Sequence, residues 1–424
     1  MPVGQKSTEM NWAGNYRYGA AAVHHPRCED ELRTLVAGAG SVRALGTRHS
    51  FNALADAEEL VCLDALAPNI TIDAAAMTAT VSGGTRYGIL ASELARHGFA
   101  LHNLASLPHI SVAGAIATGT HGSGDGNGNL ASAVAGLRFI DAAGDVRTVG
   151  RLETADFAGY VVGLGALGIV TEVTVGIEPA FEVAQHVYLD VAWDQVLADY
   201  DAVTGRAYSV SLFTDWHGEK VGQLWFKQRL GDGRTTEFPA QLLGGKAATA
   251  NIHPVPGMAA VNCTAQLGAA GPWQDRLAHF RADYLPSSGA EIQSEWLVAR
   301  EDAAAAINAL RARAGEISPV LQVTEIRSVA ADDLWLSASY QRDSVALHFT
   351  WVKDQSAVDK AVAVVEETLA PFAARPHWGK AFNARAAELA PLYPRFGDFQ
   401  VLAARLDPTG KFRNGFLDRA VFAG

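Results

Sequence analysis

Residues 97–124 read HGFALHNLASLPHISVAGAIATGTHGSG and contain no Asp, Glu, Lys or Arg. The later part of this stretch is built mainly of Gly, Ala, Ser and Thr, with His109 and His121 among them. Side chains this small let the backbone lie directly against a flat aromatic cofactor and its pyrophosphate. A tightly packed pair of loops without a ligand is the weaker interpretation of so long an uncharged run.

A second stretch, SVRALGTRHSFN at residues 41–52, places a short strand before a turn at Gly46. Such a turn exposes backbone N–H groups to a phosphate, and Arg43 and Arg48 add positive charge. On its own this stretch also fits a surface loop with an exposed histidine. The uncharged stretch at 97–124 favours a cofactor site, and His49 would then lie beside the cofactor.

The letters GLGALG at residues 163–168 match the dinucleotide-binding pattern G-x-G-x-x-G. That pattern must open a helix, whereas here the β-branched run IVTEVTV follows. We therefore predict a turn that feeds the last strand of a first domain and that can touch the cofactor.

Two later segments alternate like strands, VLQVTEIRSV and VALHFTWV. Glu325 and Arg327 stand two apart in the first, and His348 and Thr350 stand two apart in the second, so each pair points to one face. On neighbouring strands these side chains would form a polar patch that favours a polar ligand. A solvated sheet face with an ordinary ion pair fits these two strands equally well.

Lys380 is a single cation between Trp378 and Phe382 in RPHWGKAF. The pattern fits a surface lysine whose stem covers apolar rings, and it fits equally a cation lowered into a cleft.

Composition narrows the class of protein. A chain of 424 residues predicts two domains, and 49 % hydrophobic with 19 % charged residues is typical of a globular enzyme. A net charge of −11 argues against nucleic acid as a partner. Cys28, Cys62 and Cys263 are isolated, which predicts neither a disulfide framework nor a metal site and suits the cytoplasm. The sequence shows no secretory signal and no membrane span.

The chain also lacks H-E-x-x-H, G-x-S-x-G and P-loop motifs, so redox chemistry on an organic cofactor remains. From about Cys28 to Val175, short strands alternate with helices such as Glu29–Ala37, which predicts an α+β domain. After Pro179, strands and helices alternate in a way that predicts an antiparallel sheet covered by helices. No structure can be assigned to residues 231–275.

These segments together resemble a known family. GTRHSFN, ASLPHISVAGAIATGTHGSG, GALGIVTEVT, SLFTDW, HPVPGM, the EIR strand, HFTW, HWGK and DPTGKF occur in an order similar to that of the bacterial alditol (xylitol) oxidases. The likeness runs from Asn11 nearly to the C-terminus. It is specific to these oxidases within the wider vanillyl-alcohol-oxidase (PCMH) type of FAD-binding proteins.

The resemblance implies a two-domain vanillyl-alcohol-oxidase-type fold of class α+β. Residues 1–178 would form the FAD domain, 179–375 an antiparallel-sheet substrate (cap) domain, and 376–424 a return to the FAD domain. The cofactor-binding residues that it implies are Arg43, Ala44, Leu45, Gly46, Thr47, Arg48, His49, Ser50, Ser106, Ser111, Gly114, Ala115, Ala117, Thr118, Gly119, Ile169 and His348. The substrate-binding residues are Ser106, Glu325, Arg327, Thr350 and Lys380, and the catalytic ones are Arg327, Lys380, Glu325 and His348.

The resemblance further implies FAD bound covalently through His49, by a single bond because no Cys lies between Leu101 and Gly124. Relatives often have Gly before the linking histidine, where this chain has Arg48, so the loop geometry is in question there. No metal is expected.

The activity that the resemblance implies is oxidation of a terminal primary alcohol of a polyol such as xylitol, sorbitol or glycerol, with O2 reduced to H2O2. Arg327 and Lys380 would hold the reacting oxygen, Glu325 and Ser106 would orient neighbouring hydroxyls, and His348 would relay the proton. An aldonolactone oxidase or dehydrogenase is the nearest alternative, and a noncatalytic flavin- or sugar-binding protein is another. The expected partners are the polyol and O2 alone, with the protein a cytoplasmic monomer that binds neither nucleic acid nor membrane.

Overall fold

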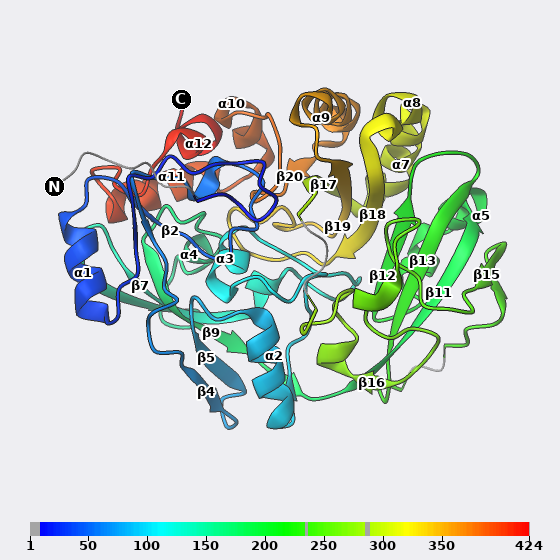
Figure 1. Ribbon diagram of the computed structural model, residues 1–424, viewed down its shortest axis with the longest axis horizontal. Coiled ribbons are helices and arrows are strands. Elements are labelled where there is room, and N and C mark those ends of the chain that lie inside the picture. Colours follow the sequence, from blue (N-terminus) through cyan, green and yellow to red (C-terminus); the bar gives the residue numbers. More distant parts are fainter. Residues whose placement is uncertain (1–8, 234–235, 285–288, 424) are drawn as a thin grey trace.

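The computed structural model describes residues 9–233, 236–284 and 289–423. Residues 1–8, at the N-terminus where the sequence predicts no secretory signal, lie outside the described residues. Residues 234–235, within the segment 231–275 to which no structure was assigned, also lie outside them. Two halves lie side by side, with the N- and C-terminal parts together in one of them (Figure 1). No described helix is long and apolar enough to cross a membrane.

The first half contains two small sheets. A parallel sheet has the order β1-β3-β2, and an antiparallel sheet has the order β4-β5-β9-β7-β8. Their strands are β1 (Ala22–His24), β2 (Val42–Ala44), β3 (Glu59–Val61), β4 (Ile70–Asp73), β5 (Thr78–Ser82), β7 (Val134–Ile140), β8 (Val146–Gly150) and β9 (Ile169–Gly176). Helices α1 (Glu29–Gly38), α2 (Tyr87–Arg96), α3 (Val112–Ala117) and α4 (Ala158–Val161) accompany them, and β6 (Phe99–Ala100) pairs with β10 (Glu178–Pro179).

The second half is built on one ten-stranded antiparallel sheet within the described ranges. Its path is β14-β15-β11-β13-β12-β18-β19-β17-β20, with β16 paired to β11. The strands are β11 (Glu182–Ala192), β12 (Ser209–Thr214), β13 (Lys220–Arg229), β14 (Gln241–Leu242), β15 (Gly245–Ala247), β16 (Gly271–Pro272), β17 (Glu291–Ala299), β18 (Leu321–Val329), β19 (Ser344–Val352) and β20 (Arg375–Pro376). The short strands β14, β15 and β16 come from residues 231–275, where the sequence shows no periodicity.

Helices α5 (Trp193–Ala198) and α6 (Tyr200–Thr204) follow β11, and α7 (Ala303–Ala312), α8 (Ala314–Ile317) and α9 (Gln355–Leu369) lie beside β17, β18 and β19 (Figure 1). In α9, Val358, Val362, Val365 and Leu369 are buried at helical spacing, which makes the inner face apolar. The antiparallel sheet of the second half and the helices beside it confirm the predicted arrangement. The domain boundaries at 178 and 375 stay predictions.

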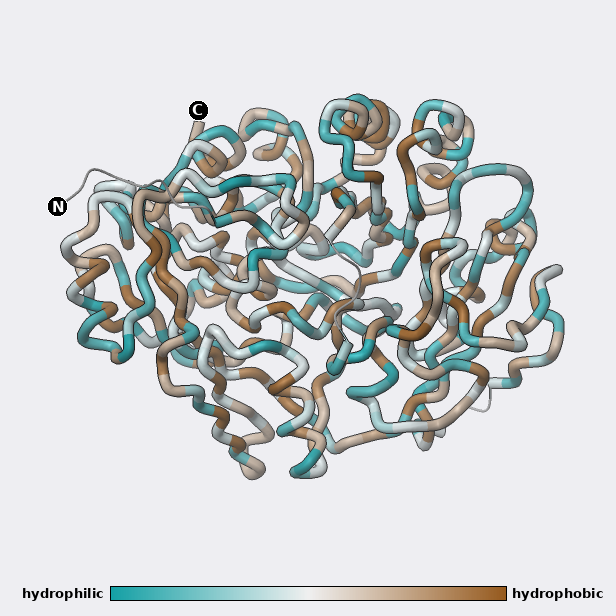
Figure 2. The backbone as a smooth tube through the Cα atoms, in the orientation of Figure 1, coloured by the Kyte–Doolittle hydropathy of each residue, from teal (hydrophilic) through white to brown (hydrophobic). Residues whose placement is uncertain are grey.

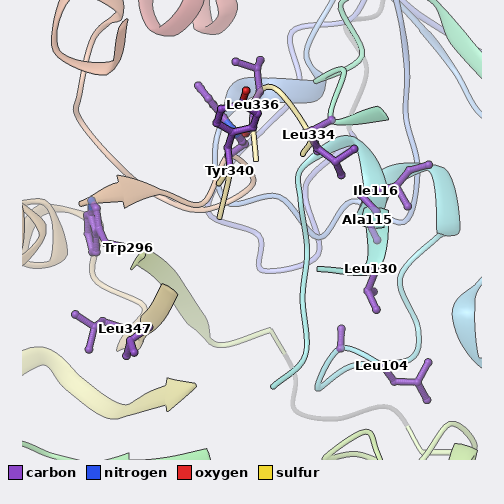
Figure 3. Close-up of a cluster of buried hydrophobic side chains, with 14 of the residues drawn as sticks. Leu104, Ala115, Ile116, Leu130, Trp296, Leu334, Leu336, Tyr340 and Leu347 are labelled. Carbon is purple, nitrogen blue, oxygen red and sulfur yellow. The ribbon is translucent and has the colours of Figure 1, made fainter. Parts of the chain in front are cut away.

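One hydrophobic core runs through both halves. In Figure 3, Leu334 lies next to Ala115 and Ile116 of the first half, and Leu336 lies beside Tyr340. Trp296 and Leu347 of the same core belong to β17 and β19 of the large sheet. Figure 2 shows hydrophobic segments along many of the interior strands, with hydrophilic segments frequent in the outer loops.

Backbone hydrogen bonds also join the halves. Gly124 forms an isolated parallel bridge with Val329 at the end of β18, where the Gly124 N–H donates to Ser328 O at 3.0 Å. The Ala330 N–H donates to Asn127 O at 3.0 Å. The uncharged stretch is thus attached to the strand that carries Arg327.

The chain after β20 returns to the first half through α10 (Ala386–Leu389), α11 (Phe396–Leu406) and α12 (Gly415–Leu417). The buried Lys411 ammonium donates to Val36 O at 2.6 Å, Ala37 O at 3.1 Å and Ala142 O at 2.8 Å. Two of these carbonyls lie in the last turn of α1, where helical carbonyls lack partners and a cation is favourable.

We predict that Lys411→Met lowers the apparent free energy of unfolding by about 1.5–3 kcal/mol, the usual size of a lost hydrogen bond to a charged group. Urea unfolding followed by tryptophan fluorescence measures this change. Lys360→Met on the exposed face of α9 is the matched control, with an expected change within about 0.5 kcal/mol. Equal stability of the two variants would contradict the capping role of Lys411.

Candidate active site

A cavity of about 450 Å³ lies between the halves and reaches from the His49 loop to the β17, β18 and β19 strands. Most of the predicted cofactor residues line it, namely Arg43, Ala44, Leu45, Gly46, Thr47, Arg48, His49, Ser50, Ser106, Ser111, Gly114, Ala115, Ala117, Thr118 and His348. Gly119 and Ile169 do not line it. Gly119 has a φ of +66°, a left-handed backbone conformation, and the Ile169 side chain is fully buried in a separate core with Val42 and Phe412.

Small residues bring the two cofactor-side loops into contact. The Ser111 N–H donates to Thr47 Oγ1 at 3.1 Å, and a Cβ on Gly46 would lie 2.7 Å from Ser111 Oγ. A side chain at position 46 would therefore displace the Ser111 hydroxyl or the loops themselves. The turn at residues 163–168 lines the same cavity and leads into β9, so its rejection as a helix-opening turn is confirmed.

The arginines of the first loop have partners within the protein. Buried Arg43 donates to Phe412 O and, at 2.5 Å, to Leu164 O, which ties the first loop to the GLGALG turn and to the C-terminal return. Arg48 pairs with Glu9 at 2.9 Å. Its φ is +63°, a left-handed conformation that glycine adopts freely and that costs other residues about 1–2 kcal/mol. The loop therefore keeps a glycine-type geometry although the residue is Arg.

His49 lines this cavity. The imidazole stacks on Trp12 with ring centroids 5.3 Å apart, and its buried Nδ1 has no hydrogen-bond partner among the described residues. Burial and then the Lys380 charge lower the pKa of His49 to about 4, so the ring is neutral near pH 7. A neutral imidazole with an unpartnered nitrogen fits attachment to a cofactor carbon.

At the other end of the cavity, β18 and β19 pair in register so that Glu325 lies opposite His348. With Arg327 and Thr350 these side chains share one face, and all four are at most 9 % exposed. The ordinary solvated sheet face is therefore wrong. The predicted polar patch exists, and it is buried against the cavity.

Glu295 of β17 is the centre of this patch, and it was not among the sequence-predicted residues. Its Oε1 accepts from Arg327 Nη2 at 2.6 Å and lies 3.1 Å from His121 Nε2, while its Oε2 lies 3.3 Å from His348 Nδ1. Although burial alone raises the pKa of Glu295, the Arg327 charge and the neighbouring His121 and His348 rings hold it well below the usual range. Glu295 is thus a buried carboxylate that orients both Arg327 and His348.

The His348 ring lies between two partners, with Nε2 3.4 Å from Thr350 Oγ1 and Nδ1 3.3 Å from Glu295 Oε2. Burial is the main reason that its pKa is lowered. A neutral imidazole held by a carboxylate on one side has its other nitrogen available to accept a proton, which is the arrangement of a general base.

Lys380 reaches the cavity from the segment after β20. Its ammonium donates to Gln293 Oε1 and lies 5.1 Å from the Phe51 ring centroid, so Phe51 is the ring that it faces, not the neighbours Trp378 and Phe382. Asn52 Nδ2 donates to Lys380 O at 2.7 Å, which ties this segment to the His49 loop. Burial lowers the pKa of Lys380 to about 8.

Comparison with known proteins agrees with this geometry. The family described as an FAD binding domain matches residues 20–150, and the family described as D-arabinono-1,4-lactone oxidase matches residues 287–420. Over 411 residues the chain is 48 % identical to an alditol oxidase of Streptomyces sp. (strain IKD472 / FERM P-14339), which covers 96 % of this chain and 97 % of that protein. The chain belongs to the alditol oxidase family.

This chain is also similar to the L-gulono-1,4-lactone dehydrogenase of Mycobacterium tuberculosis, a more distant relative. The two are 27 % identical over 97 % of this chain and 98 % of that protein. The crystal structure of cholesterol oxidase from B. sterolicum superposes with a TM-score of 0.75 at 15 % identity, covering 97 % of this chain and 96 % of that one. The predicted vanillyl-alcohol-oxidase-type FAD fold is confirmed. The chain is a flavoprotein oxidoreductase.

Five more residues that lie in or behind this site were not among the predicted site residues, namely His121, His377, Gln293, Lys227 and His279. For Lys227 and Glu295 the available signal was a charged residue beside an apolar strand run, since Lys and Glu are rarely buried without a partner.

We predict that Glu295→Gln slows flavin reduction by alditol by ~10²–10³-fold, because Arg327 and His348 lose the charge that orients them. Anaerobic stopped-flow absorbance measures the rate. Glu366→Gln on α9, another partly buried carboxylate, is the control and should reduce at the parent rate. An unchanged reduction rate in a folded Glu295→Gln protein would remove Glu295 from the site.

Proposed function

We propose that this chain oxidises the terminal primary alcohol of alditols, such as xylitol, sorbitol or glycerol, to the aldose, and that O2 is reduced to H2O2. One observation carries the proposal. One cavity is lined both by His49, whose Nδ1 has no partner in the described part of the chain, and by the buried face of Glu325, Arg327, His348 and Thr350. The 48 % identity to an alditol oxidase supports the polyol as substrate.

In this proposal FAD, when bound, accepts the hydride from the alcohol carbon. His49 holds the flavin covalently through Nδ1, and no second protein bond is made. The backbone of residues 43–50 and the small residues of 106–119 hold the rest of the cofactor, so that residues 1–178 with 376–424 serve as FAD domain and 179–375 as substrate domain.

The protein groups act on the substrate oxygens. Arg327 and Lys380 place two positive charges at the reacting hydroxyl and stabilise developing negative charge on its oxygen. His348, held by Glu295, accepts the hydroxyl proton at Nε2. Glu325 accepts hydrogen bonds from the next hydroxyls, and Ser106 can accept from them or donate to them. Arg327 Nη1 lies 3.4 Å from Ser106 Oγ, which keeps these groups together.

The direct test is anaerobic addition of xylitol to the purified protein. Bleaching of the yellow flavin band, followed by H2O2 formation on adding air, is the expected result. A spectrum that does not change with any alditol would contradict the proposal and favour a noncatalytic flavin- or sugar-binding protein.

A second candidate function is oxidation of an aldonolactone. The lactone oxidase family match covers residues 287–420, which include β17, β18 and β19 of the site. Parallel rates with xylitol and L-gulono-1,4-lactone decide between the two, and the alditol should be the faster substrate.

We further propose a cytoplasmic monomer. The three cysteines are free, which suits a reducing compartment. Size-exclusion chromatography with light scattering tests the oligomeric state.

His49→Ala should release FAD on denaturation, whereas the parent protein should keep its colour in an acid-precipitated pellet. The reason is that the variant lacks the nitrogen that makes the bond. Absorbance of pellet and supernatant measures the split. Free FAD from the parent protein would show that the flavin is not covalently held.

Lys380→Met should slow flavin reduction by ~10²-fold or more while thermal stability changes little, because a charge at the reacting oxygen is lost. Stopped-flow reduction and a thermal melt measure the two effects. Lys353→Met, an exposed lysine, should leave both at the parent value. If Lys380→Met reduces as fast as the parent, Lys380 has no part in the reaction.

Glu325→Leu should remove most of the preference for a diol over a simple alcohol. Hydrogen bonds to charged groups contribute about 1.5–3 kcal/mol, so the parent should favour 1,2-hexanediol over 1-hexanol by ~10–100-fold in kcat/KM. The variant should lose this ratio through slower diol oxidation. An undiminished ratio would assign recognition to other residues, with Ser106 and Thr350 next in line.

A further inference from the structure

A buried lysine and a histidine lie behind Glu325 and continue the polar face away from the cavity. The sheet register places Lys227 of β13 opposite Ser209 of β12, and Phe213 of the same strand lies opposite Glu325. Because Ser209 and Phe213 are four apart, Lys227 and Glu325 are on one face of the sheet. His279, from the segment after β16, fills the space between them.

The three side chains form a continuous hydrogen-bonded chain. Lys227 Nζ lies 2.9 Å from His279 Nδ1, and His279 Nε2 lies 2.7 Å from Glu325 Oε1. Arg327 Nε is also nearest to Oε1, at 3.7 Å. Among the described residues these contacts all use Oε1, so Oε2 is the oxygen left for a substrate hydroxyl.

Chemistry fixes the direction of each bond. The Glu325 carboxylate only accepts, so His279 Nε2 must carry the proton. Burial and then Lys227 lower the pKa of His279 to about 4, so the ring is neutral and Nδ1 is an acceptor. That acceptor needs a donor, and the Lys227 side chain supplies one whether it is an ammonium or an amine. Lys227 thus selects the tautomer that donates to Glu325.

Lys227 also anchors the backbone that carries His279. Its Nζ donates to Leu277 O, and the N–H groups of His279 and Phe280 each donate to Ser106 O at 3.2 Å. Two aromatic rings hold the imidazole at its edges, with centroid distances of 5.2 Å to Trp225 and 5.6 Å to Phe213. One buried lysine therefore supports both Glu325 and Ser106, the two residues to which we assign the neighbouring hydroxyls.

Lys227 is 2 % exposed and is not among the residues that line the cavity. Burial lowers the pKa of its ammonium to about 7, partly offset by the Glu325 charge. A long cationic side chain is costly to bury, and a leucine or methionine would fill the same core position. Its place in the core is therefore explained by the bonds to Leu277 and His279.

We propose that Lys227 and His279 are positioning residues that determine specificity, because they hold Glu325 in the one orientation that recognises a hydroxyl next to the reacting alcohol. The inference rests on the proposed role of Glu325 in polyol oxidation. Lys227 does not line the cavity, so the inference extends the specificity determinants one layer beyond the groups that a substrate can touch, whereas His279 lines the cavity itself.

The test compares kcat and KM for 1,2-hexanediol and 1-hexanol in the flavin-loaded enzyme. Lys227→Met and His279→Leu should each lower the diol preference in kcat/KM by ~10-fold. Since the second hydroxyl is bound equally in ground and transition state, the change should be in KM more than in kcat. His279→Gln keeps one donor and one acceptor and should retain most of the preference.

Gln185→Met is the matched control. Gln185 lies opposite Lys227 in the β11–β13 pair and is fully buried, so its replacement tests the loss of a buried polar group on the neighbouring strand. It should keep the diol preference. If Lys227→Met and His279→Leu keep the preference while thermally stable, the proposal is overturned. It is also overturned if diol and simple alcohol slow in parallel, which indicates a structural role only.

Glu325→Leu separates this proposal from the one on which it rests. Loss of the diol preference in Glu325→Leu without loss in Lys227→Met overturns the positioning role alone. A preference that survives in Glu325→Leu overturns both. If Lys227→Met does not fold, the contrast between His279→Gln and His279→Leu decides, because both keep Lys227 and differ in the two hydrogen bonds.

Discussion

The buried Glu295 carboxylate is the constraint on which the substrate end of the protein depends. Three strands must pair in register for β17 to present Glu295 to Arg327 and His348 at hydrogen-bonding distance. An ionised carboxylate in a low-dielectric interior is costly unless basic groups surround it, and removing one partner leaves an uncompensated charge. The cluster of Glu295, Arg327 and His348 therefore holds the side chains of the site in place. It does so only when β17, β18 and β19 pair in this register.

The cofactor end is assembled from segments far apart in the chain. Asn52 donates to the carbonyls of Trp378 and Lys380, and Arg43 donates to carbonyls of the GLGALG turn and of the C-terminal return. The segment after β20 is in turn joined to β17, because the His377 N–H donates to Glu295 O at 2.9 Å. Lys380 is therefore fixed relative to both His49 and Glu295.

Local sequence pattern predicted the parts of the site that depend on local geometry. The period of two identified Glu325, Arg327, His348 and Thr350, and the uncharged stretch identified the cofactor loop. Glu295, Lys227 and His279 could not be found this way, because the pairing of distant strands and one irregular segment bring them to the site. The short strands of residues 231–275 could not be found this way either, since β15 and β16 pair with the distant strand β11 and β14 pairs with β15.

The bridge between Gly124 and Val329 has a consequence for how molecules enter and leave. A hinge opening of the two halves would have to break paired backbone at the end of β18, where one half carries the cofactor loop and the other the reacting groups. Exchange of substrate and product without such an opening requires local motion of the residues that line the cavity, among which residues 253–255 precede the exposed Met258. Loop motions commonly gate turnover in enzymes, so the bulk of these side chains bears on which alcohols reach the site.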